Sequence, residues 1–264
     1  MTSAIEPLAR AGYGARGLVY LIVGFFAVLA AMGNGQAKDS EGALRTILAQ
    51  PFGTILVWLM VVGLAGYAVW RLVQAFLDPD HIGNGAKGLV VRAGLFVSAL
   101  THIALAFFAV GLVSTWGGSG GGGGGGGDPT AEWLAKAFDA GYAQILVWIA
   151  AAIAVGVGCA FVWKGASRGF EKFFKCPESI MRWLRPVAIV GLVARGAVFM
   201  ILAVLIVTGG SVYDPEARPG LEDALEALQR FTFGWLVLLV LAFGLAAFGA
   251  YSLAQARYRH INVD

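Results

Sequence analysis

The sequence predicts an all-α integral membrane protein with six transmembrane helices, built from three parallel two-helix repeats with pseudo-threefold symmetry. The chain of 264 residues is 58% hydrophobic and only 13% charged, and its mean hydropathy is +0.75. Soluble domains are about 25% charged, so much of the surface of this chain must face lipid. Its apolar runs are close to the roughly 20 residues that cross a bilayer. The third observation is that one stretch of sequence occurs three times.

The first helix of this repeat carries a glycine and an arginine that recur. Gly12 and Arg16 of the first copy correspond to Gly191 and Arg195 of the third, and Gly94 and Ser98 take those places in the middle copy. The second helix of each copy opens with a matching dipeptide, Phe52-Gly53, Tyr142-Ala143 or Phe233-Gly234. Near the end of this helix, the first and third copies share a Gln-Ala pair, Gln74-Ala75 and Gln255-Ala256. Two spans per copy make every copy start on the same side, which predicts a pseudo-threefold axis along the membrane normal. The copies occupy residues 9–80, 88–166 and 186–258 of a single membrane domain, 1–264.

Six apolar runs qualify as spans. They are Gly17–Met32, Phe52–Leu77, Leu89–Trp116, Tyr142–Trp163, Val187–Gly209 and Phe233–Ala256. The first run resembles a signal peptide in outline. Because the same helix reappears at residues 187–209, we interpret it as the first transmembrane helix, with Arg16 at its edge.

The basic residues predict the orientation. With the N-terminus inside, the inner segments hold fourteen of the 19 Lys and Arg residues and the outer segments hold five. The outer loops also hold ten of the 16 acidic residues. The positive-inside rule then places both termini in the cytoplasm, for a multi-pass protein of the bacterial inner membrane.

The links between spans carry three further features. Each outer link holds a short amphipathic helix, and this helix either lies flat on the outer membrane surface or docks on neighbouring loops. The three helices are Glu41–Gln50, Ala131–Ala140 and Leu221–Arg230. Residues 117–128 include eight consecutive glycines and predict a flexible outer loop. The basic loop 167–185 interleaves aromatic and basic residues, which favours contact with anionic lipid on the cytoplasmic side. A protein partner at this loop is the second interpretation.

Ionisable residues inside spans are functional candidates. The candidate ligand- or lipid-binding residues are Arg16, Ser98, His102 and Arg195. Threefold geometry would bring Arg16, Ser98 and Arg195 to one level in the inner leaflet, where two positive charges attract an anionic headgroup or solute. The alternative is that each arginine snorkels to the inner surface.

His102 lies near mid-membrane and either lines a cavity, ligates a haem or bonds within the bundle. A haem with two histidine ligands needs a second buried histidine, and His81 and His260 lie outside the spans, so we favour a His102 that is hydrogen-bonded within the bundle. No Ser/His/Asp set, paired carboxylate, zinc motif or nucleotide fingerprint is present. We therefore expect no enzyme activity, no metal, no cofactor and no nucleic-acid partner.

Three segments resemble a family of bacterial membrane proteins. They are the opening ARAGYGARGLVYLIVG, the run GALRTILAQPFGTILVWLM and the ending GAYSLAQARYRHI. The family is the domain-of-unknown-function family numbered twelve hundred and six, built of three tandem two-helix units. The resemblance is specific at Arg16, Gln50-Pro51-Phe52-Gly53, Arg195 and Gln255–Tyr258, whereas the middle copy departs from it at Ser98 and Ala140-Gly141-Tyr142-Ala143. It implies an integral inner-membrane protein and adds no catalytic residues.

Two functions follow from these features. The first is a non-enzymatic bundle that binds lipid or a protein partner, favoured by the lack of acidic residues in the centre of any span and by the basic inner face. The alternative is a passive channel or solute transporter with a site on the pseudo-threefold axis, favoured by the four candidate residues.

Overall fold

A computed structural model describes residues 2–32, 40–116, 143–209 and 234–261. Six helices in these ranges are long and apolar enough to cross a membrane, which confirms the six predicted spans. The long helices are α1 (Thr2–Ala31), α3 (Gly53–Phe76), α4 (Ala86–Trp116), α6 (Ala143–Ala166), α7 (Glu178–Gly209) and α9 (Gly234–Tyr258).

Two helices begin earlier than the sequence predicts. The first begins at Thr2, so Arg16 lies inside the candidate span Glu6–Ala31 and not at its edge. Likewise, α7 begins at Glu178, which shortens the predicted loop 167–185 so that it ends before that residue. Each of these extensions contains a proline, Pro7 or Pro186. Proline is tolerated near the start of a helix because the first N–H groups have no partner within the helix, and membrane helices also tolerate it further along.

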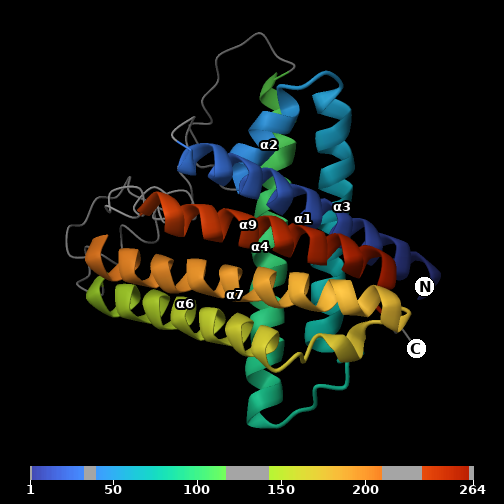
Figure 1. The fold of residues 1–264 in the computed structure, drawn as a ribbon. Helices are drawn as coiled ribbons and strands as arrows, with labels where there is room; N and C mark the ends of the chain where they lie inside the picture. Colours follow the sequence, from blue (N-terminus) through green and yellow to red (C-terminus); the bar gives the residue numbers. More distant parts are fainter. Residues whose placement is uncertain (1, 33–39, 117–142, 210–233, 262–264) are drawn as a thin grey trace.

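The long helices pack in the order α4, α3, α1, α9, α7, α6. Three tandem repeats around an axis would form this same row and would close it by packing α4 against α6. These two helices are not packed together over the described residues. Figure 1 shows the α3–α4 pair running across the direction of the other four long helices. The closed threefold arrangement is therefore not confirmed, and the described helices form an open row.

The first and third copies nevertheless share a close contact between their two helices at matched residues. A Cβ added at Gly12 would lie 2.6 Å from the backbone N of Tyr67, and one at Gly191 would lie 2.5 Å from the backbone N of Phe248. Such close approach of two backbones needs a residue without a side chain. The α1–α3 and α7–α9 contacts thus bring matched residues together, as the matched sequences predict.

The predicted helix Glu41–Gln50 is present as α2 (Ser40–Leu48). Its apolar face is buried against neighbouring helices, mainly α1, α3 and α4, so it docks on the protein. The buried residues are Ala43, Leu44, Ile47 and Leu48. The predicted helices Ala131–Ala140 and Leu221–Arg230, and the glycine-rich loop 117–128, lie outside the described residues.

Both chain ends lie at one end of the molecule, which we call the terminal end (Figure 1). Arg10 Nη1 of α1 donates to the carbonyl of Ala256 near the end of α9, at 2.8 Å. The segment between α6 and α7 includes the short helix η1 (Glu171–Phe173). This segment also lies at the terminal end, because the N–H of Lys175 donates to the carbonyl of Tyr258, the last residue of α9, at 2.9 Å. The buried polar residues gather near this end.

Candidate functional site

The most buried arginine in the membrane-spanning helices is Arg16 of α1, with 5% of its surface exposed. Its guanidinium donates to Ser252 Oγ at 3.2 Å, to Gln255 Oε1 at 2.6 Å and to the phenol oxygen of Tyr67. These acceptors come from α9 and α3, the two helices that flank α1. The snorkelling interpretation is wrong for Arg16, because the side chain is tied to interior acceptors and does not extend to the surface.

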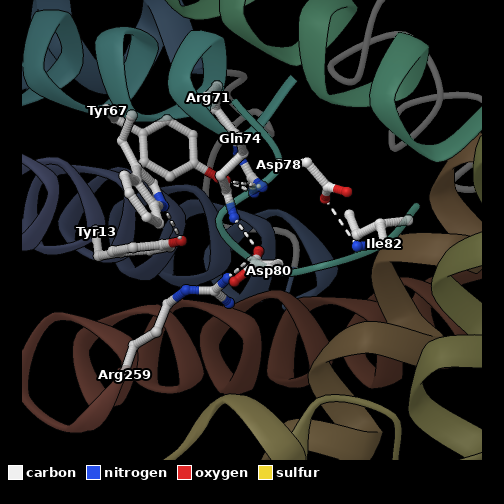
Figure 2. A network of polar contacts seen from close by, with 9 residues as sticks. Tyr13, Tyr67, Arg71, Gln74, Asp78, Asp80, Ile82 and Arg259 are labelled. Carbon is white, nitrogen blue, oxygen red and sulfur yellow. Dashed lines mark hydrogen bonds and ion pairs between the residues drawn. The ribbon is translucent and has the colours of Figure 1, made fainter. Parts of the chain in front are cut away.

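Tyr67 links Arg16 to a second arginine. Its phenol oxygen also accepts a hydrogen bond from Arg71 Nε at 2.8 Å. Arg71 Nη1 in turn donates to Gln74 Oε1 at 3.0 Å, one turn further along α3 (Figure 2). A single phenol oxygen thus accepts hydrogen bonds from two cations that repel each other.

The network ends at Asp80, in the turn after α3. Its Oδ2 accepts hydrogen bonds from Gln74 Nε2 at 2.5 Å and from Arg259 Nη2 at 2.8 Å (Figure 2). Asp80 and Arg259 form an ion pair with 11% and 3% of their side chains exposed. This pair ties the turn after α3 to the chain beyond the end of α9.

The turn itself is shaped by Asp78, which has a φ of 50°. Its carboxylate accepts the backbone N–H groups of Ile82 and Gly83, each at 2.7 Å (Figure 2). These two hydrogen bonds stabilise the charged carboxylate and hold the pKa of Asp78 below its ordinary value. The folded turn places Asp80 two residues later, against Arg259.

The structure places His102 beside this network. Its ring lies 4.5 Å from the ring of Tyr67, and its Nδ1 donates to the carbonyl of Ser98 at 2.6 Å. The prediction that His102 is hydrogen-bonded within the protein is confirmed. Ser98 joins the cluster through its main-chain carbonyl, and its placement opposite Arg16 and Arg195 on a threefold axis stays a prediction.

Arg195 of α7 lies among aromatic rings. The carbon of its guanidinium is 4.6 Å from the ring centre of Tyr20, 4.8 Å from Phe161 and 4.5 Å from Phe248. Phe199 completes the set at 5.8 Å. Phe248 is shared, since the guanidinium of Arg16 lies 5.1 Å from the same ring. The structure therefore brings both predicted arginines to one cluster.

The guanidinium of Arg195 differs from that of Arg16 in its hydrogen bonds. Its Nε and Nη1 atoms are buried and have no partner in the part of the chain that the structure describes. Aromatic faces attract a cation, but they are weak acceptors for N–H groups. Arg195 therefore keeps hydrogen-bonding capacity that nothing in the described residues uses.

The cluster as a whole carries excess positive charge. Its cations are Arg16, Arg71, Arg195 and Arg259, and the amino group of Lys164 of α6 lies nearby. Against these, Asp80 is the single carboxylate that the described network contains. No group of three or more metal-ligating side chains occurs within the described ranges. Buried arginines with donors to spare are suited to an oxyanion, such as a phosphate or a carboxylate.

Several residues of this cluster were not among the predicted site residues. Tyr67, Ser252 and Phe248 are ordinary residues of apolar helices by sequence, and only the packing shows that they surround the arginines. Gln74 and Gln255 did give a signal, because the two glutamines match between copies. Asp80 lies outside the predicted spans, and a carboxylate outside a span is not by itself a sign of a functional site.

The comparisons with known proteins agree with the repeat and the fold class. The family model Domain of Unknown Function (DUF1206) matches residues 11–78 and 190–259, which are most of the first and third copies. The chain is 30% identical over 262 residues to the Uncharacterized protein YxxB of Bacillus subtilis (strain 168), covering 97% of this chain and 92% of that protein. No solved structure matches the chain. The matched residues include all four arginines of the cluster and the matched glycines Gly12 and Gly191, and the chain belongs to the DUF1206 family.

Proposed function

We propose that this protein is a non-enzymatic, multi-pass membrane protein that binds an oxyanion at the buried arginine cluster. The observation that carries the proposal is the charge imbalance. Four arginines gather where the described network holds one carboxylate, Asp80. A charge buried away from water is costly unless an opposite charge accompanies it, so an anionic ligand would stabilise this arrangement.

An anionic lipid is the source of the oxyanion that we favour. The outer faces of the long helices expose many large apolar side chains, among them Phe25, Val62, Phe107 and Phe243. Lipid therefore surrounds the cluster, and a phosphate headgroup has apolar chains that can lie along these faces. A soluble oxyanion offers the same chemistry to the arginines, and the experiment below separates the two sources.

A passive channel or solute carrier for an anion is the second function. It is favoured by the position of Arg16 and Arg195, which lie well inside α1 and α7 and not at their ends. A carrier moves its ligand from one side to the other, whereas a lipid-binding bundle does not. Flux is therefore the property that distinguishes the two functions.

The orientation and the threefold axis belong to the same proposal. The terminal end would face the bacterial cytoplasm, because the predicted inner segments carry the excess of Lys and Arg. The segment between α6 and α7 would then meet anionic lipid or a protein partner. Closure of the row between α4 and α6 would complete the pseudo-threefold ring and place the arginine cluster near its axis.

The proposal is tested with purified protein reconstituted in lipid. Native mass spectrometry would count dioleoyl phosphatidylglycerol molecules retained by the protein, with dioleoyl phosphatidylcholine as the neutral comparison. Parallel proteoliposomes would report flux of inorganic phosphate. The test variant is Arg16→Ala/Arg195→Ala, and the control is Arg257→Gln, which removes an exposed charge at the same end.

Selective retention of phosphatidylglycerol, lost in the double variant and kept in Arg257→Gln, is the expected result. Phosphate flux that depends on the two arginines would overturn the lipid-binding function and support the carrier function. Equal retention of both lipids together with no flux in the wild-type protein would overturn both functions. A thermal unfolding curve of each variant separates loss of the ligand from loss of the fold.

A further inference from the structure

Arg16 and Arg195 occupy the same place in two copies of the repeat, yet of the two only Arg16 has hydrogen-bond acceptors among the described residues. The close helix contacts beside them involve matched residues, since Gly12 meets Tyr67 and Gly191 meets Phe248. The guanidinium of Arg16 lies 4.7 Å from the ring of Tyr67, and that of Arg195 lies 4.5 Å from the ring of Phe248. The difference between the two arginines therefore comes from the residues at matched positions around them.

The first matched position lies on the second helix of the same copy. Tyr67 and Phe248 each precede a matching glutamine, Gln74 or Gln255, by seven residues. Tyr67 supplies the phenol oxygen that accepts from Arg16. Phe248 has no oxygen, so the same place beside Arg195 offers a ring face and no acceptor.

The other two positions lie on the helix of the preceding copy in the row. For Arg16 that helix is α9, which provides Ser252 and Gln255. For Arg195 it is α6, since α7 packs between α9 and α6. Ala143 and Gly234 open the two helices at matched positions, so the places of Ser252 and Gln255 fall on Phe161 and Lys164. A phenyl ring is only a weak acceptor for a guanidinium N–H, and a protonated lysine has no acceptor atom.

All three acceptors of Arg16 are thus replaced around Arg195 by groups without an acceptor oxygen. Arg195 therefore keeps the positive charge of its matched residue but lacks the hydrogen-bond acceptors that Arg16 has. The aromatic rings hold the guanidinium in place by cation–π attraction while its buried Nε and Nη1 donors have no described partner. This is the arrangement expected of a residue whose partner is an external anion, whereas Arg16 is fully engaged in holding α1 to α3 and α9.

We propose that Arg195 is the residue that binds the oxyanion, in an aromatic site formed by α1, α6, α7 and α9, and that Arg16 is structural. The ligand is an anionic amphiphile, because the site combines one cation with the apolar faces of Tyr20, Phe161, Phe199 and Phe248. This inference rests on the proposed function and narrows it to one arginine of the cluster.

The test restores an internal acceptor to Arg195. Phe248→Tyr places a phenol where Tyr67 places one beside Arg16, and the control Phe243→Tyr adds a phenol on an exposed side chain of the same helix. Affinity for dioleoyl phosphatidylglycerol is measured by native mass spectrometry. Phe248→Tyr should weaken binding by about tenfold, because the internal hydrogen bond competes with the ligand. Arg195→Gln should abolish selective binding.

A second pair of variants covers the case in which the larger side chain does not fit beside the buried Phe248. Lys164→Gln and Lys164→Met both remove the lysine charge, but only glutamine offers the acceptor that Gln255 gives to Arg16. Weaker binding by Lys164→Gln than by Lys164→Met supports the inference. Inorganic phosphate is the competing probe, and competition by phosphate as strong as that by the lipid would overturn the amphiphile assignment.

The outcomes separate this inference from the proposed function. A wild-type protein that binds no phosphatidylglycerol overturns the proposed function. A wild-type protein that binds it, with Phe248→Tyr and Lys164→Gln each equal to its control, leaves the proposed function standing and overturns the role of Arg195.

Discussion

A Cβ placed on Gly12 would lie 2.4 Å from the Cβ of Tyr67, closer than any real pair of such atoms. The contact sets the distance between α1 and α3 at the level of the arginine cluster. It also sets the distance over which Arg16 reaches the phenol of Tyr67. The absence of a side chain at one residue thus positions the hydrogen bonds of another, one turn away.

Gly12→Ala should therefore destabilise the protein. The methyl group meets the backbone of Tyr67 and forces α1 and α3 apart, at an expected cost of about 2 kcal/mol, in the range of overpacked cores. The thermal unfolding midpoint in detergent measures the effect. Gly94→Ala is the matched control, since Gly94 has the same place in the middle copy and an added Cβ there meets nothing within 4 Å. Its unfolding midpoint should stay the same or rise, because alanine favours helix.

Arg16→Met should destabilise the fold strongly, because Arg16 is bonded to interior acceptors. Removal of a snorkelling arginine would have only a small effect. The substitution keeps an unbranched apolar side chain and leaves Gln255 Oε1 without its donor in a buried place. We expect a loss of about 2–4 kcal/mol, the sum of one or two unsatisfied buried groups. Arg10→Met removes a partly exposed arginine near the start of the same helix and should cost less than about 1 kcal/mol. Equal unfolding midpoints for the two variants would contradict the structural role of Arg16.

Asp80→Ala should loosen the terminal end. It leaves Arg259, whose side chain is 3% exposed, without its carboxylate, and breaking a buried ion pair in this way costs about 3 kcal/mol. Residues beyond α9 should then become accessible to protease, with the cleavage site read by mass spectrometry. Glu178→Ala, which removes an exposed carboxylate 3.4 Å from Arg185, is the control and should leave the cleavage pattern unchanged.

The ion pair between Glu171 and Arg185 predicts a pH dependence at the segment between α6 and α7. Arg185 donates to both carboxylate oxygens of Glu171, at 2.7 and 3.1 Å, and this holds the pKa of Glu171 below its ordinary value of 4.5. Because of this lower pKa, the carboxyl group of Glu171 binds fewer protons in the folded state than in the unfolded state. Its stabilising contribution is therefore complete above pH 4.5 and disappears as the pH falls through the lower folded pKa.

Glu171→Gln should lower the unfolding midpoint slightly at neutral pH, as expected for a partly exposed pair worth at most about 1 kcal/mol. The difference from the wild-type protein should shrink once the pH is well below 4.5, the ordinary pKa of the carboxyl group. Unfolding curves measured across this acidic range provide the check. A difference that persists or grows at low pH would contradict the assigned ion pair.

The spans of the fold could be predicted because lipid demands a long apolar run for each crossing, and such runs are local features of the sequence. The match between Gly12 and Gly191, and between Arg16 and Arg195, was also visible, since copies of one repeat conserve their residues. The extension of α1 to Thr2 could not be predicted, because polar residues at the start of a helix resemble those of a loop.

The sequence by itself determined that the chain has six segments long and apolar enough to span a membrane, that it repeats a two-helix unit and that Arg16 and Arg195 are the candidate site residues. Only the tertiary structure decided what the two arginines do. Their partners lie on other helices, and a hydrogen bond between helices depends on distance and burial, which are properties of packing and not of any local pattern. Packing gives Arg16 three acceptors and surrounds Arg195 with rings, and it leaves α4 and α6 apart where the repeat alone predicted a closed ring.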